Sequence, residues 1–193
     1  MKKIIAIALT LVFLCGAIPV LADTEIITPS KTTGDLTTLE VTVENPIEGK
    51  PVTAVPVNSQ NAAQYKAQAD AAEAGLAKAV AAGTVENYFG EETTNAIKEV
   101  LGDAEKINMD EFFAFVLNGY EEAMGKATFT AKMPTPYAGK EVAVLIGLVE
   151  DGQVNWTTIK GIGLEDGSVQ FTVEPELAEK IQQGVALMTV CSK

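Results

Sequence analysis

The sequence contains no arginine and no histidine, so its only cationic side chains are 14 lysines, against 26 aspartates and glutamates. Without histidine, the chain cannot form a Ser-His-Asp or Cys-His catalytic system, a histidine general base or a zinc site with histidine ligands. A net charge of −12 and the lack of arginine also argue against nucleic-acid binding, which needs a basic surface to contact phosphates. The same repulsion disfavours binding to anionic membranes.

Cysteine is equally scarce, because the chain has only Cys15 and Cys191. Cys15 lies in a segment that we expect to be removed, which leaves Cys191 as a single thiol with no partner for an internal disulfide. An odd cysteine in a secreted protein indicates either an intermolecular bridge or a free thiol. The apolar run over 187–191 favours a terminal strand in which the cysteine simply packs in the core.

Residues 1–22 have the pattern of a cleavable secretory signal peptide. Two lysines precede an apolar run over 4–14, and small side chains predict cleavage after Ala22. The run is shorter than the roughly 20 residues that span a bilayer, so no integral membrane segment is expected after cleavage. Lipid attachment at Cys15 is disfavoured because the bulky Leu14 precedes it. The predicted product is secreted and keeps twelve lysines and all 26 acidic residues, a net charge of −14.

The remaining chain divides by composition into three parts. Residues 23–57 are rich in threonine, proline and valine and predict an extended or β arm, or a linker. Residues 58–102 predict a helical segment, in which an alanine-rich stripe packs against the rest of the chain or against a second copy. Residues 103–193 predict a β-sandwich module. The stripe consists of Ala62, Tyr65, Ala69, Ala72, Leu76 and Ala79.

Short strands separated by turns dominate the last part. Asp-Gly turns near residues 151 and 166 join alternating, β-branched segments, which is typical of an antiparallel sandwich or barrel. A short helix is expected over 175–183, before a terminal strand over 185–191. The apolar run within 110–118 suits a buried strand or a buried helix, and its three phenylalanines followed by Asn-Gly favour a strand.

Three runs in this part, 136–147, 151–156 and 165–173, resemble the immunoglobulin-like β-sandwich modules of secreted and surface proteins of Gram-positive gut bacteria. The helix over 96–102 is similar to the one that leads into those modules, and the resemblance covers about residues 92–193. It implies an α+β fold, with a helical N-terminal segment followed by a C-terminal antiparallel sandwich, and a cell-surface setting. It carries no catalytic residues. The usual Ser-Pro-Phe before the final strand is replaced here by the 175–183 stretch.

Two kinds of side chain are candidates for ligand chemistry. Paired carboxylates could hydrolyse glycosides if two of them faced each other across a cleft, although solvated faces and turns also explain adjacent acids. Acidic turns could hold calcium, but no Asp-x-Asp-x-Asp-Gly loop is present. Aromatic side chains could form a sugar-stacking platform, with a core position as the alternative. The acid pairs are Glu91/Glu92, Asp110/Glu111, Glu121/Glu122, Glu150/Asp151 and Glu165/Asp166, and the aromatic residues are Trp156, Tyr137 and Tyr120.

These features favour a secreted, non-enzymatic extracellular module with a protein or glycan ligand, serving adhesion, binding or envelope organisation. The alternative is a secreted carbohydrate-active hydrolase that uses paired carboxylates. A third hypothesis is an assembly protein that oligomerises through the alanine-rich helix or Cys191. The sequence assigns no catalytic, cofactor-binding or metal-binding residue, and no cofactor is expected.

Overall fold

A computed structural model of the chain describes residues 25–27, 38–57, 84–102, 106–110, 112–133, 136–150, 153–184 and 186–193. It also describes seven separate positions between 63 and 82, among which Lys66 and Asp70 form an exposed ion pair four residues apart. The predicted signal peptide and all six residues of the alanine-rich stripe lie outside the described residues.

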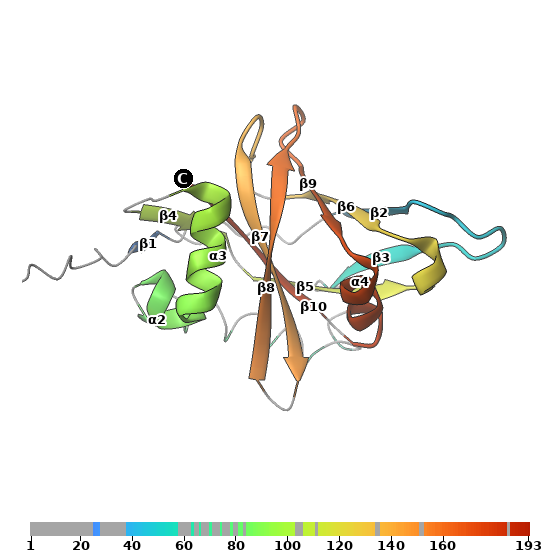
Figure 1. Cartoon of the computed structure of the whole chain (residues 1–193), viewed down its shortest axis with the longest axis horizontal. Coiled ribbons are helices and arrows are strands. Elements are labelled where there is room, and N and C mark those ends of the chain that lie inside the picture. Colours follow the sequence, from blue (N-terminus) through green and yellow to red (C-terminus); the bar gives the residue numbers. More distant parts are fainter. Residues whose placement is uncertain are drawn as a thin grey trace, which may run out of the picture.

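Most of the described chain is β-structure (Figure 1). The helical elements are short and include one 3-10 turn, η1. The strands are β1 (Glu25–Ile27), β2 (Thr38–Val43), β3 (Thr53–Val57), β4 (Lys106–Met109), β5 (Phe113–Asn118), β6 (Ala127–Lys132), β7 (Glu141–Glu150), β8 (Gln153–Gly163), β9 (Val169–Val173) and β10 (Ala186–Ser192). The helices are α2 (Val85–Phe89), α3 (Glu91–Leu101), η1 (Glu122–Met124) and α4 (Pro175–Gln182).

These strands form one sheet that curls almost into a closed barrel. The order is β1-β4-β10-β7-β8-β9-β6-β2, and β5 pairs with both β10 and β3. All pairings are antiparallel except that of β1 with β4. β2 and β3 contact each other without ladder pairing, so the sheet stays open there, at the opposite end of the molecule from α3 (Figure 1).

Large side chains fill the inside of this sheet. Phe129 stacks on Phe171 with 5.2 Å between the ring centroids and meets Phe115 edge-on at 5.7 Å. Met124 and Met188 close the remaining space and are fully buried. A barrel of about eight strands leaves an interior just wide enough for side chains, so this interior is a packed core.

A second apolar layer lies between the outside of the sheet and the helices α2 and α3. Alternate residues of β7 explain it: Val144 and Ile146 face the inner core, whereas Ala143 and Leu145 face Ile97 of α3. Because both faces of β7 are covered, its sequence is apolar without alternation. Figure 1 shows α3 standing beside β7 and β8.

The predicted fold class is therefore wrong. The described residues do not form a helical N-terminal segment followed by an immunoglobulin-like sandwich, because they make one nearly closed antiparallel sheet with few helices. The physical reason is long-range pairing: β2 adds to β6 and β3 adds to β5, across gaps of about 60 to 90 residues that local periodicity does not register.

Several local predictions are confirmed. Residues 113–118 are a strand, and five of its six side chains are buried because β3 and β10 flank it. The short helix after Glu174 forms as α4, with Pro175 in its first turn, and β10 is the terminal strand. The helix over 91–101 ends before Gly102, which takes a φ of 73° that favours glycine.

Candidate functional site

A groove of about 520 Å³ runs between the outer helices and one edge of β8. Its helical wall is formed by Phe89 of α2 and by Glu92, Thr93 and Ala96 of α3. Its other wall is formed by five consecutive residues of β8, Val154–Thr158. Side chains of consecutive strand residues point to opposite faces, so a groove that touches all five runs along the edge of the strand.

Part of this edge lacks a neighbouring strand because β8 is much longer than β9, the strand that pairs with it on this side. β7 pairs with β8 along ten residues, from Glu150 opposite Gln153 to Glu141 opposite Ile162. β9 pairs with β8 only at Gly161–Gly163. Along residues 156–160 the outer edge of β8 thus has no strand partner within the described part of the chain, and such an edge can pair with an added strand.

Trp156 forms the aromatic part of the groove. Its ring is half-buried and meets Phe89 edge-on at 5.4 Å and Phe112 at 5.3 Å between centroids. On β7 it lies opposite Gly147, where an added Cβ would be 2.6 Å from Trp156 Cζ3. Glycine at this position therefore leaves the space that the indole occupies. Trp156 is also the only tryptophan of the chain.

Polar groups accompany the tryptophan. The Thr158 hydroxyl is buried and has no hydrogen-bond partner within the described residues, although it lines the groove. A buried hydroxyl without a partner costs free energy unless a ligand or water pairs with it. Glu92 is exposed at the helical wall, and Thr157 is exposed on the strand. The groove thus combines an aromatic surface, hydrogen-bonding groups and one carboxylate, which suits a ligand that is part apolar and part polar.

The predicted aromatic platform does not form. Tyr120 and Tyr137 are buried, with 1% and 2% of their surface exposed, and belong to the inner core, while Trp156 packs in the outer layer. Tyr120 and Tyr137 lie in connections between strands, so the alternation of strand residues gave no signal of their burial. Of the three, only Trp156 lines a groove.

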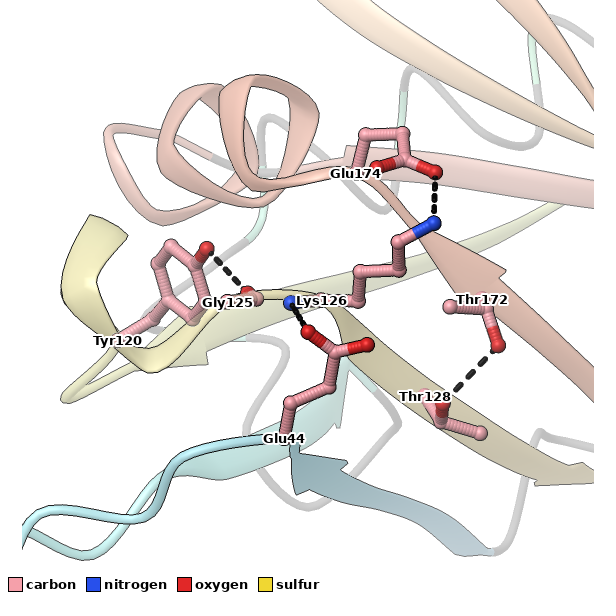
Figure 2. Close-up of polar contacts among 7 residues, drawn as sticks. All are labelled: Glu44, Tyr120, Gly125, Lys126, Thr128, Thr172 and Glu174. Atoms are coloured by element: carbon pink, nitrogen blue, oxygen red, sulfur yellow. Dashed lines mark hydrogen bonds and ion pairs between the residues drawn. The ribbon is translucent and has the colours of Figure 1, made fainter.

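Tyr120 instead stabilises one corner of the sheet, which is shown in Figure 2. Its hydroxyl donates to the backbone oxygen of Gly125 at 2.7 Å. The next residue, Lys126, donates its backbone N–H to Glu44 at 3.2 Å and its ammonium to Glu174 at 2.7 Å. These bonds join the ends of β2, β6 and β9. The Lys126–Glu174 pair is exposed and so contributes little stability, whereas the buried tyrosine bond contributes more.

A buried polar cluster joins β4, β10 and the loop before β7. The hydroxyl of Tyr137 is hydrogen-bonded to the carboxylate of Asp110, and the Thr189 hydroxyl donates to the Asp110 backbone oxygen at 2.9 Å. Burial, reinforced by Asp110, raises the pKa of Tyr137 and of the neighbouring Cys191 thiol well above their ordinary values. Cys191 is fully buried and stays protonated at neutral pH, so its predicted packing role is confirmed.

Among the described residues, no two of the paired carboxylates face one another across the groove. Glu92 lines it, while Glu91 is exposed in the first turn of α3. Asp166 accepts from the Ser168 hydroxyl at 2.6 Å and the Ser168 N–H at 3.0 Å, which explains the Glu165/Asp166 pair as a turn. Glu121 and Glu122 are exposed beside η1. Glu111, Asp151 and the side chain of Glu150 lie outside the described residues.

Two further features are absent from the described residues. They contain no group of three or more acidic, cysteine or histidine side chains placed to hold a metal ion. None of their helices has the length and apolar composition needed to cross a membrane.

Comparison with known proteins gives no identity to this arrangement. No family model matches the chain, and neither a curated protein nor a solved structure matches it.

The groove was also not predicted from the sequence. The one available signal was the unequal length of the segments around the Asp-Gly turn near 166, because an eleven-residue strand beside a five-residue strand leaves an edge uncovered.

Proposed function

We propose that this protein is a secreted, non-enzymatic binding module whose ligand occupies the groove between α3 and β8. The observation that carries the proposal is the combination, in one groove, of a half-buried tryptophan, a buried hydroxyl without a partner and an open strand edge. Ligand sites typically join apolar and aromatic lining with a few hydrogen-bonding groups. The secretory pattern of residues 1–22 supports an extracellular setting.

Binding is favoured over glycoside hydrolysis by the distribution of acids. A glycosidase needs two carboxyl groups about 5–10 Å apart on either side of the scissile bond. Glu92 is the one acidic residue among those that line the groove, and the strand opposite it supplies Asn155, Thr157 and Thr158. This wall offers hydrogen bonds to a ligand but no second carboxylate.

Fluorescence of the single tryptophan tests this role directly. We expect groove ligands, drawn from neutral oligosaccharides and extended peptides, to change the emission of Trp156 on titration. Calorimetry should then show at least tenfold weaker binding to Trp156→Ala, because truncation removes an aromatic anchor worth about 2 kcal/mol or more. The matched control is Ile47→Ala, in a second hollow of about 520 Å³ between β2 and β3.

Two results would contradict the proposal. One is equal loss of affinity in Ile47→Ala and Trp156→Ala, which would place the ligand elsewhere or show a general loss of structure. The other is release of reducing sugar from an oligosaccharide at a rate that Glu92→Gln abolishes. The secretory part is tested separately by the intact mass of protein recovered outside the cell, which should correspond to a chain that starts at Asp23.

A further inference from the structure

We propose that the ligand is an extended cationic peptide, which adds to the open edge of β8 as a further antiparallel strand and lies against α3. This inference rests on the proposed binding role of the groove. It goes beyond that role by naming the class of partner and the way in which it is held. Strand addition to a sheet edge is a general mode of peptide recognition, in which backbone hydrogen bonds supply affinity and side-chain contacts supply specificity.

The edge has the length and composition that strand addition needs. Residues 156–160 would span about 17 Å at roughly 3.3 Å per residue, enough to pair with about five residues of a partner. Residues 156–159, Trp-Thr-Thr-Ile, carry no charge, and three of the four are β-branched. Lys160, at one end of the edge, is charged and forms an ion pair with Glu141 of β7. Natural proteins commonly protect open edges with charges, prolines or bulges. The absence of such protection over residues 156–159 fits an edge that is used.

The helix next to the edge gives the added strand a specific face. In an added strand, alternate side chains would point toward α3, where Trp156 and Phe89 already form an aromatic surface. Thr158 lies in the same groove, and its hydroxyl could pair with a backbone group of the added strand. Both features favour an extended chain with an apolar side chain at every second position.

The negative charge of the helices beside the groove favours a cationic peptide over other extended partners. The helical residues 85–101 contain four glutamates and a single lysine, Lys98, and Glu92 lies in the groove wall itself. A second copy of this chain would bring a net charge of −12 against the same acidic helices, which disfavours self-pairing. A partner with lysine or arginine on its solvent-facing positions would instead be attracted.

The test uses seven-residue peptides of alternating valine and lysine with blocked termini, titrated against the full protein while Trp156 emission is recorded. Two N-methylated versions carry methyl groups on the odd or on the even residues. In an antiparallel pair, alternate residues direct their N–H groups to the partner strand. We therefore expect one version to bind at least tenfold more weakly and the other to bind like the parent, although all three carry the same charge.

Two protein variants test whether the acidic helix attracts the cationic peptide. Glu92→Lys should weaken binding of the valine–lysine peptide about fivefold to tenfold at low salt, since it replaces an attraction by a repulsion at an exposed site. Glu99→Lys is the matched control, because it changes the same helix and the net charge equally at an exposed position outside the groove wall. A peptide with glutamate in place of lysine should bind at least tenfold more weakly than the parent peptide.

The possible results separate this inference from the binding role on which it rests. Equal binding of both N-methylated peptides, or equal effects of Glu92→Lys and Glu99→Lys, would overturn strand addition by a cationic peptide. Binding of a neutral chitin-derived oligosaccharide, with a change in Trp156 emission and no response to the peptides, would overturn it too but would keep the groove as a binding site. If neither probe nor the wider ligand panel changes that emission, both proposals fail.

Discussion

Gly147 controls the position of the tryptophan in the groove, and replacing it by alanine is a sharp test of the structure. An added Cβ would lie 2.6 Å from Trp156 Cζ3, 2.9 Å from Trp156 Cε3 and 2.6 Å from Val154 Cγ1. Ordinary carbon contacts are about 3.5–4.0 Å, so both side chains must move by about 1 Å. Overpacking of this kind costs about 1–3 kcal/mol, and the lower chain entropy of alanine offsets about 0.5–1 kcal/mol of it.

We therefore expect Gly147→Ala to lower the unfolding free energy by about 1–2 kcal/mol in urea denaturation. Because the indole must shift, its emission spectrum should also differ from that of the parent protein in the native state. Gly184→Ala is the control, since an added Cβ there has no atom within 4 Å and its φ is not positive. The reasoning is refuted if Gly147→Ala and Gly184→Ala share the emission and the stability of the parent protein.

Two further predictions concern the buried polar groups. The unfolding free energy should hold steady up to about pH 9 and fall above it, because the folded pKa values of Cys191 and Tyr137 lie above their ordinary values of 9.0 and 10.0. Each group then contributes a loss of up to about 1.4 kcal/mol per pH unit. Urea denaturation between pH 8 and 11 measures this, and an unchanged slope above pH 10 in Tyr137→Phe would contradict it. Tyr120→Phe removes the 2.7 Å bond to Gly125 and should cost about 1–3 kcal/mol in the same assay, with peptide binding at the groove unaltered.

The two walls of the groove come from different layers of the protein, the outer helices and the sheet. α3 covers Leu145 of β7 and thereby fixes the helical wall, while the long β7–β8 pair carries the strand wall. A ligand held by both walls would bind only the folded arrangement of helix and hairpin. Ligand binding should consequently raise the unfolding free energy of the whole protein by RT ln(1 + L/Kd), where L is the ligand concentration, a gain that grows with the logarithm of the ligand concentration above Kd.

Local patterns of the sequence indicated several of the helices and strands, and the composition gave the net charge. Three phenylalanines followed by Asn-Gly favoured a strand at β5, and patterns over a few neighbouring residues predicted α3, α4 and β10. The lack of arginine and histidine likewise fixed which catalytic and nucleic-acid-binding chemistries are excluded.

The order of the strands in the sheet is visible in the three-dimensional structure and not in the sequence. The pairing of β2 with β6 and of β3 with β5 joins distant segments, and it turned a predicted sandwich into a nearly closed sheet. The same pairings determine that β9 covers only three residues of β8. The open edge, the half-buried Trp156 and the groove follow from that mismatch. Periodicity shows which face of a strand is apolar, but the partner of an edge depends on contacts that no local pattern records.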